Sequence, residues 1–396
     1  MTIVTLSRPG LVSALGCGID ETRERLFAGD TSGMIAETGW LRGNVIARVG
    51  KFSAPLPMHP DGESHRRHDS RNNRLLLAAF AQIAADFRAL LDRHGPDRIG
   101  VVLGTSTSGV AEGEAAIAAH ARDGQFPDRF FYEQMEIGDP AVFLARFLSL
   151  GGPAYTVSTA CTSGGKAFVS ARMLIEAGFC DAVITGGVDS LCRLTIGGFT
   201  ALESTSPDLC QPLSRNRRGI NIGEGAALFL MAADAGPVAL LGVGESSDAH
   251  HISAPEPEGR GAEAAMRAAL ANARLEPDDI GYLNLHATAT PKNDAMESLA
   301  VARCFTNGIP VSGTKPLTGH ALGAAGALEA AICWLALTDQ AGRLPPHIWD
   351  GAADPALPRL DTVSTGRCFA PGRRVAMSNS FAFGGNNLSL ILGSVA

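Results

Sequence analysis

Short apolar runs alternate with longer segments of helical periodicity along most of the chain. Strand candidates lie at residues 98–104, 181–189 and 280–285, and apolar residues spaced three and four apart predict helices at 75–91 and 260–274. Strands that alternate with helices indicate an α/β fold with mostly parallel sheets. A chain of 396 residues has room for two or three units, or for one large α/β body.

Two distant segments share one pattern. Residues 155–177 and 309–330 each begin with a β-prone run, continue into a polar turn and end in a helix of small residues. This internal repeat predicts two related halves, which we place at residues 1–240 and 241–396. Glycine and alanine leave a helix thin enough to be covered on both faces, so we expect a central helix between two sheets.

Composition restricts the classes of function. The net charge of −7 argues against general nucleic-acid binding. No apolar run reaches the roughly 18 residues that a membrane span needs, and the first residues do not resemble a signal peptide. The eight cysteines are scattered without a C-x-x-C pair. We therefore expect neither a zinc site nor disulfides, but reduced thiols in a cytoplasmic protein.

Cys161 lies where a β-prone run passes into a helical segment. Small residues surround it in Ser158-Thr-Ala-Cys-Thr-Ser-Gly-Gly165, which permits a sharp turn and a close approach by another molecule. The free N–H groups and the dipole at a helix N-terminus favour the thiolate form of a cysteine. Two interpretations fit Cys161 taken alone: a nucleophile, or a buried cysteine that packs as a small hydrophobic residue.

Three later stretches place polar residues after β-prone runs. His286 follows an apolar run, at the kind of strand end where α/β sheets hold ligands. His320 begins the second small-residue helix, in the same relative position as Cys161, and we expect its imidazole to be neutral. Residues 376–387 include Gly384 and a second glycine in a tight loop. Each stretch alone fits a structural role, but together they favour a cysteine-based catalytic site.

Six motifs, in order along the whole chain, resemble those of the elongating β-ketoacyl-acyl-carrier-protein synthases of the thiolase superfamily. The motifs are Thr159-Ala-Cys-Thr-Ser-Gly164, Gly186-Gly-Val-Asp189, Gly223-Glu-Gly-Ala-Ala227, Asn284-Leu-His-Ala-Thr-Ala-Thr-Pro-Lys-Asn-Asp294, Thr314-Lys-Pro-Leu-Thr-Gly-His320 with Gly323-Ala-Ala-Gly326 and Glu329, and Ser378-Asn-Ser-Phe-Ala-Phe-Gly-Gly385. A cysteine with two histidines is similar to the elongating branch of the family. The resemblance implies a thiolase-like duplicated α/β fold, layered helix/sheet/helix/sheet/helix, with two pseudo-symmetric halves.

The resemblance also implies a decarboxylative Claisen condensation. Cys161 would take an acyl chain from a carrier-protein thioester, and the N–H groups of Cys161 and Phe383 would form the oxyanion hole. Malonyl carrier protein would then lose CO₂. His286 and His320 would stabilise the enolate as neutral donors, which avoids burying two cations. The carbanion would attack acyl-Cys161 and release a β-ketoacyl product.

Other residues take supporting roles by the same resemblance. Lys315 would orient the histidine site with Glu329 as its partner, and Phe383 would swing as a gate on its glycine-rich loop. The remaining expected site residues are Thr288, Thr290 and Gly384. No metal and no cofactor of the chain's own is expected, because phosphopantetheine arrives on the carrier protein.

The partner expected from the family is an acidic acyl carrier protein. Residues 65–74 and 215–218 are basic in an otherwise acidic chain, so we expect Arg66, Arg71 and Arg217 to contact the carrier. An ordinary solvated surface is the alternative for such clusters. The family also implies a homodimer, or a heterodimer with a ketosynthase-like subunit, and residues 183–188 are our candidate for the shared edge.

Departures from the family pattern indicate a divergent member. Ala382 and Ala287 stand where glycine is usual, Lys292 where an apolar residue is common, and Leu213-Ser214 and Arg218 where Phe-Asp and Asp are usual. They favour a specialised polyketide or aryl-polyene pathway over housekeeping fatty-acid synthesis.

Three other functions compete with this interpretation. The two histidines and the lack of a second cysteine in a C-x-G context argue against coenzyme A chemistry of the thiolase kind. A cysteine hydrolase needs neither the Phe383 loop nor Lys315. A non-catalytic partner of the chain-length-factor kind typically lacks the active cysteine, which this chain retains.

Overall fold

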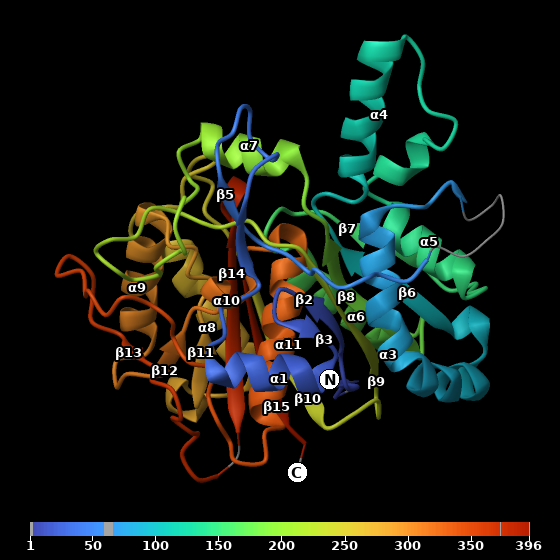
Figure 1. The fold of residues 1–396 in the computed structure, drawn as a ribbon. Helices are drawn as coiled ribbons and strands as arrows, with labels where there is room; N and C mark the ends of the chain where they lie inside the picture. The colour runs from blue at the N-terminus through green and yellow to red at the C-terminus, as the bar shows by residue number, and fades with distance from the viewer. Residues whose placement is uncertain (1–2, 59–65, 373, 396) are drawn as a thin grey trace.

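Five layers of helix and sheet make up the computed structural model, which describes residues 3–58, 66–372 and 374–395. Figure 1 shows them across the molecule as an outer helical layer, the C-terminal strands, two central helices, the N-terminal strands and a second outer helical layer. The helices of these layers are, in that order, α8 (Arg260–Ala273) with α9 (Pro291–Cys304), α6 (Ser163–Glu176) with α11 (Ala325–Leu337), and α3 (Arg71–His94) with α5 (Asp139–Phe147). The predicted layered α/β architecture is confirmed.

The N-terminal strands combine parallel and antiparallel pairing. β7 (Ala154–Val157), β6 (Ile99–Gly104) and β8 (Ala182–Asp189) run parallel to one another, and β9 (Gly225–Ala232) pairs antiparallel with β8. β8 lies between β6 and β9, and all its residues are buried. The prediction that residues 183–188 form a shared edge is therefore wrong. β7 stands at the open end of this group of strands.

The C-terminal strands repeat this arrangement, with three parallel strands followed by an antiparallel one. These strands are β12 (Pro310–Ser312), β11 (Tyr282–Asn284), β14 (Val375–Ala382) and β15 (Asn386–Ser394). The short strand β13 (Asp361–Thr362) adds a further parallel strand beside β12. β10 (Val238–Ser247) pairs with β15, and β1 (Thr5–Leu6) connects β10 to β9, so both groups share one strand path. The boundary at residue 240 stays a prediction, and β10 runs across it.

Smaller elements complete the fold. Its further strands and helices are β2 (Gly10–Ser13), β3 (Gly16–Cys17), α1 (Ile19–Ala28), β4 (Met34–Glu37), β5 (Ala47–Gly50), α4 (Val110–Asp123), α7 (Arg193–Ala201) and α10 (Lys315–Thr318). Its 3-10 turns are η1 (Pro96–Arg98), η2 (Tyr132–Met135), η3 (Pro277–Asp279), η4 (Leu322–Ala324) and η5 (Phe383–Gly385). Figure 1 shows α4 projecting from the body. Among the described residues, no helix is both long and apolar enough to cross a membrane.

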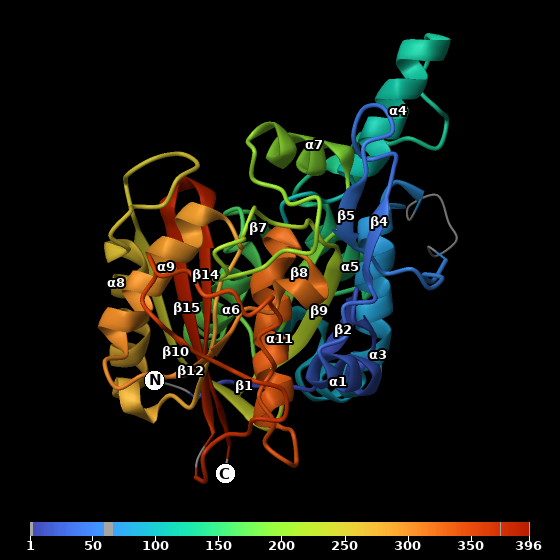
Figure 2. The same ribbon diagram turned by 60° about the vertical axis from the view of Figure 1, so that its left-hand side comes forward.

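The central helices pack as closely as their small residues allow. Every residue of α11 is buried, and Figure 2 shows this helix between the two groups of strands. A Cβ atom at Gly326 would lie 2.9 Å from the backbone nitrogen of Gly165 on α6. Real Cβ atoms essentially never approach other atoms that closely, so glycine is required where the two helices meet. The sandwiched small-residue helix predicted from the sequence is present.

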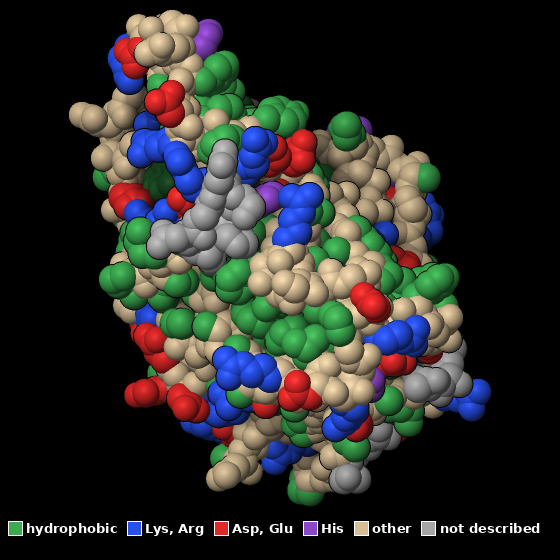
Figure 3. Space-filling model, turned by 90° about the vertical axis from the view of Figure 1, so that its right-hand side faces the viewer, with side chains coloured by type: hydrophobic (Ala, Val, Ile, Leu, Met, Phe, Trp, Pro, Cys, Tyr) green, Lys and Arg blue, Asp and Glu red, His purple; other side chains and the backbone are tan. Residues whose placement is uncertain are grey.

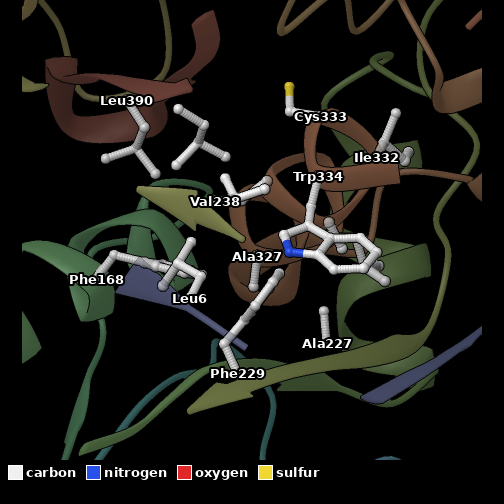
Figure 4. Packing of buried hydrophobic residues seen from close by; sticks show 14 of the residues in the cluster. Leu6, Phe168, Ala227, Phe229, Val238, Ala327, Ile332, Cys333, Trp334 and Leu390 are labelled. Atoms are coloured by element: carbon white, nitrogen blue, oxygen red, sulfur yellow. The ribbon is translucent and has the colours of Figure 1, made fainter. Parts of the chain in front are cut away.

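Aromatic side chains fill the space beside the central helices. Figure 4 shows Phe168 of α6, Phe229 of β9 and Trp334 of α11 in one buried cluster. The rings of Phe168 and Phe229 meet edge to face with centroids 5.4 Å apart. Burial of each such ring contributes on the order of 2 kcal/mol. This cluster joins α6, α11 and β9 and so fixes α6, the helix that begins two residues after Cys161.

Candidate active site

A strained turn places Cys161 between β7 and α6. β7 ends at Val157 and α6 begins at Ser163, as the sequence predicts for this region. Ala160 has a φ of 53°, a left-handed conformation that costs an alanine about 1–2 kcal/mol. The Ser163 hydroxyl accepts a hydrogen bond from the Thr159 N–H at 2.9 Å and donates one to the Ala160 carbonyl at 2.5 Å. These bonds hold the turn that directs Cys161 toward the cavity described below.

His320 and His286 lie next to Cys161. The Nε2 atom of His320 is 3.0 Å from the Cys161 Sγ, and the two imidazole rings are nearly perpendicular with centroids 5.4 Å apart. One ligating atom of each of the three residues lies within 4.8 Å of the other two. The predicted Cys/His/His set is thus brought together from both groups of strands.

The loop after β11 positions His286 through its backbone. The N–H groups of His286 and Ala287 both donate to the carboxylate of Glu297 on α9, at 2.8 and 2.7 Å. Burial raises the pKa of Glu297 to about 7. Glu297 is a functional residue that its sequence context does not reveal. Its only signal was its place one helical turn after Asp294, on the same face of α9.

Lys315 and Glu329 form a buried ion pair behind the histidines. The Lys315 Nζ is 2.5 Å from a carboxylate oxygen of Glu329 and 3.5 Å from the His286 Nδ1, and it also donates to the His286 carbonyl. Because an ammonium group can only donate, the Nδ1 atom that faces it must accept. A neutral His286 then carries its proton on Nε2.

Burial governs the protonation of the site. It raises the pKa of the Cys161 thiol to about 12, although Lys315 and the N–H group of Phe383, which is hydrogen bonded to the sulfur, oppose the shift. The expected preference for thiolate at the helix N-terminus is therefore outweighed by desolvation. Burial, followed by the charge of Lys315, holds the pKa values of His286 and His320 well below their usual range. The resting site therefore contains a thiol and two neutral imidazoles.

His320 is not placed quite as the sequence predicts. Gly319, with a φ of 70°, ends α10, and the turn η4 separates His320 from the start of α11 at Ala325. Cys161, by contrast, stands only two residues before α6. The two segments are related in pattern, but a 3-10 turn is inserted in the second.

The Phe383 loop closes one side of the site. Gly384 and Gly385 have φ values of 83° and 74°, which favour glycine, and the Gly384 N–H donates to the Ile252 carbonyl at 2.7 Å. The Phe383 ring packs on Phe199 of α7 with centroids 5.4 Å apart. Ala382 has an extended φ of −116°, so alanine fits there without strain.

One cavity of about 330 Å³ connects these groups. Residues that line it include Cys161, His286, His320, Phe383, Thr288, Thr290, Phe199 and Lys292. The Thr288 and Thr290 hydroxyl oxygens are 2.9 Å apart, so one can donate to the other. One thiol, two neutral imidazoles and the hydroxyl groups of Thr288 and Thr290 therefore line the cavity.

A thiol and two imidazoles are also the donor types of a metal site. The ligating atoms of Cys161, His286 and His320 are near enough to share one metal ion. The Lys315 ammonium beside His286 opposes a positive ion there. That the site needs neither a metal nor a cofactor of its own stays a prediction.

The structure places two of the three predicted docking arginines, Arg66 and Arg71, along one groove and Arg217 elsewhere. Arg71 donates to the buried carboxylate of Glu224 and to the Phe52 carbonyl, and Arg217 donates to Asp354 and to the Ser214 carbonyl. Both guanidinium groups therefore have partners within the chain, although the Arg71 side chain remains partly exposed. Arg66 is exposed, on the rim of a groove of about 1120 Å³ beside α4. His65, part of the same predicted basic cluster, lies outside the described residues.

Family models and curated relatives agree on one family. A model described as "Beta-ketoacyl synthase, N-terminal domain" matches residues 24–235, and "Beta-ketoacyl synthase, C-terminal domain" matches residues 238–348. A 3-oxoacyl-[acyl-carrier-protein] synthase 2 of Staphylococcus aureus is 33% identical over 351 residues, which are 84% of this chain and 86% of the relative. Nodulation protein E of Rhizobium leguminosarum bv. trifolii is 36% identical over 330 residues, 80% of each chain.

Solved structures give the same result. A chain from a ketosynthase (ApeO) in complex with its chain length factor (ApeC), from Xenorhabdus doucetiae, has a TM-score of 0.94 and 46% identity, over 100% of this chain and 98% of that one. A chain of the ishigamide ketosynthase/chain length factor has a TM-score of 0.86 and 27% identity, over 100% of both chains.

Proposed function

Since the chain belongs to the β-ketoacyl synthase family, acyltransferases that form carbon–carbon bonds, we propose that it condenses an acyl chain held on Cys161 with malonyl carrier protein. The observation that carries the proposal is the contact between a buried thiol and a neutral imidazole, Cys161 Sγ and His320 Nε2 at 3.0 Å, beside a second neutral imidazole. This arrangement provides a nucleophile with its base and two neutral donors in one cavity.

In the first step the chain is transferred to the enzyme. As the Cys161 sulfur attacks the carbonyl carbon of an acyl thioester, its proton passes to the His320 Nε2. The oxyanion accepts hydrogen bonds from the N–H groups of Cys161 and Phe383. The carbon–sulfur bond to the carrier breaks, and the carrier thiolate takes the proton back from His320. Acyl-Cys161 and a free carrier thiol result.

In the second step a malonyl thioester loses CO₂. After acylation the proton of neutral His320 exchanges through solvent from Nδ1 to Nε2. The thioester oxygen then accepts hydrogen bonds from the Nε2–H groups of His286 and His320, which stabilise the enolate as the carboxyl carbon–carbon bond breaks. Lys315 keeps the His286 proton on Nε2. The enolate carbon attacks acyl-Cys161, the bond to sulfur breaks, and the Cys161 thiolate takes from water the one proton that the condensation consumes. The product is a β-ketoacyl thioester on the carrier.

We propose an acidic acyl carrier protein as the partner that brings the phosphopantetheine arm. Figure 3 shows Lys and Arg side chains around a hollow at the base of α4, the groove that Arg66, Arg122 and Arg129 line. Arg66 and Arg129 are exposed, and within the described residues neither has an ion-pair partner. Arg71 also lines this groove, whereas Arg217 does not, so we place the docking surface here with Arg66 and Arg71.

We propose that a second ketosynthase-like subunit pairs along β7. This strand is the open end of the N-terminal strands, and Tyr155 on it is 36% exposed. Ile137 and Met173, from segments that flank β7, are also exposed. The partner is a second copy of this chain or a chain-length-factor-like subunit. The identity of 46% to a chain of a ketosynthase–chain length factor structure supports the second choice.

We propose a specialised pathway of the polyketide or aryl-polyene kind, in the cytoplasm, and the identity to a chain of a ketosynthase–chain length factor structure supports the specialised pathway. That identity exceeds the 33% shared with the 3-oxoacyl-[acyl-carrier-protein] synthase 2. Purified enzyme that elongates saturated chains as well as unsaturated or aryl chains would contradict this assignment.

The experiment that tests the function combines enzyme, an acyl carrier protein and malonyl carrier protein, with and without a chain-length-factor-like subunit. Mass spectrometry should find the acyl group on Cys161 and a β-ketoacyl carrier extended by one condensation. Release of free acid alone would favour a hydrolase. Absence of both acyl-Cys161 and product would favour a non-catalytic partner. A Cys161→Ala variant is the control, and it should form neither species.

A further inference from the structure

His347 is a buried histidine that the reaction above does not use. It lies in the segment between α11 and β13 and is 6% exposed. Its backbone N–H donates to the Val363 carbonyl at 2.9 Å, and the N–H of Val363 donates to Val311 of β12. The His347 backbone is therefore fixed to β12, the strand that precedes Lys315 at the start of α10.

The imidazole of His347 bridges two loops of the active-site region. Its Nδ1 accepts a hydrogen bond from the Gly313 N–H at 3.0 Å, and its Nε2 donates to the Pro212 carbonyl at 3.1 Å. An amide N–H can only donate and a carbonyl can only accept, so a single neutral tautomer satisfies both partners. Burial lowers the pKa of His347 to about 4, which agrees with a permanently neutral ring.

Both hydrogen-bond partners of His347 belong to segments that contact or precede catalytic residues. Gly313 stands two residues before Lys315, and a Cβ atom at Gly313 would lie 2.5 Å from the Cβ of Ala287, the neighbour of His286. Gly313 is thus held between His347 and the His286 loop. On the other side, Leu213 follows Pro212, and its N–H donates at 2.8 Å to Asp294, which also accepts from Ala289.

We propose that His347 is a positioning residue for decarboxylation: its bridge between Gly313 and Pro212 holds Lys315 against the Nδ1 of His286. The inference rests on the proposed function, because it assigns His286 and Lys315 to the malonyl step. Cys161 acylation uses His320 and the Phe383 N–H, which His347 does not contact. Loss of the bridge should therefore slow decarboxylation and leave the rate of Cys161 acylation nearly unchanged.

The test compares two half-reactions in the full chain. Cys161 acylation from acyl carrier protein is followed by intact-protein mass spectrometry, and CO₂ release is measured from malonyl carrier protein alone. His347→Leu, which removes both hydrogen bonds, should lower CO₂ release at least tenfold with acylation within twofold of wild type. His347→Gln should recover most of the loss, because its amide offers an acceptor oxygen and a donor nitrogen. If His347→Leu does not fold, His347→Met removes the same bonds with a flexible side chain of similar length.

His68 provides the matched control. It is 3% exposed, hydrogen bonded through Nδ1 to Asp139, and absent from the lining of the catalytic cavity. His68→Leu should lower stability but leave the ratio of the two half-reactions unchanged. The proposal is overturned if the apolar His347 variants lower both half-reactions equally, or neither, or if His347→Gln recovers nothing. If wild type itself performs neither half-reaction, the proposed function fails instead.

Discussion

The Nε2 atom of His320 lies 3.0 Å from the sulfur of Cys161, although the two residues are 159 positions apart in the sequence. Both side chains are buried, and burial drives the pKa of the thiol up and that of the imidazole down. The pair therefore rests as a thiol and a neutral imidazole. A charged thiolate–imidazolium pair would need both protonation equilibria to be reversed.

The protonation of Cys161 can be read from its alkylation by iodoacetamide. Because its folded pKa is about 12, above the ordinary 9.0, the reactive thiolate should be scarce at pH 7 and labelling should rise steadily up to pH 11. Exposed Cys368 is the internal comparison, with each site quantified by peptide mass spectrometry. Faster labelling of Cys161 than of Cys368 at pH 7 would show a resting thiolate and contradict this description.

Lys315→Met should destabilise the fold and remove decarboxylation. It leaves Glu329 buried without its cation, at a cost of about 3–5 kcal/mol near neutral pH. Burial raises the pKa of Glu329 above its unfolded value, so the variant should keep more stability at low pH and lose it as pH rises. Urea unfolding at several pH values measures this.

The double variant Lys315→Met/Glu329→Gln separates stability from catalysis. It removes the unpaired carboxylate and should recover much of the unfolding free energy with a flat pH dependence. CO₂ release should stay about 100-fold below wild type, because the His286 tautomer is no longer fixed. Recovery of CO₂ release along with stability would show that Lys315 acts only on the fold.

Ala289 tests whether the His286 loop stores backbone strain. Its φ of 61° is left-handed, whereas Ala327 lies in the regular helix α11, and both alanines are fully buried. Replacement by glycine should cost about 1–2 kcal/mol less at Ala289 than at Ala327, since strain relief offsets the lost methyl group. Equal losses of unfolding free energy at the two positions would mean that the loop is unstrained.

Charge reversal at Arg66 tests the docking surface beside α4. Arg66→Glu should raise the KM for carrier-bound substrates roughly tenfold at low salt, with a smaller effect at high salt and none on malonyl pantetheine. Arg217→Gln is the contrast: its side chain pairs with Asp354, so stability should fall and KM should not rise in a salt-dependent way. A KM for carrier substrates that stays unchanged in Arg66→Glu would remove this groove from the interface.

The catalytic set was predictable because its residues carry local signals. Cys161 and His286 follow β-prone runs, and parallel strands deliver such positions to one edge of a sheet. The Gly-Ala character of α11 likewise predicted burial on both faces. These features depend on periodicity and residue size over short stretches, which the sequence displays directly.

Features that depend on distant partners were not predictable in this way. The basic character of Arg217 suggested docking, but Asp354 neutralises it from far along the chain. An apolar run fits a strand inside a sheet as well as a strand at a buried edge. β8 lies inside the sheet, so its apolar run did not indicate an edge. His347 is isolated in the sequence, and only the fold brings it between Gly313 and Pro212.

A single-turnover experiment with His286→Ala tests the assignment of His286 to the malonyl step most directly. Wild type, mixed with acyl and malonyl carrier proteins, should form acyl-Cys161 and then the β-ketoacyl product. His286→Ala should form acyl-Cys161 at nearly the wild-type rate and accumulate it, because acylation uses His320 while decarboxylation needs both neutral donors. Condensation by His286→Ala at the wild-type rate, or loss of acylation together with condensation, would contradict the assignment of His286 to the malonyl step.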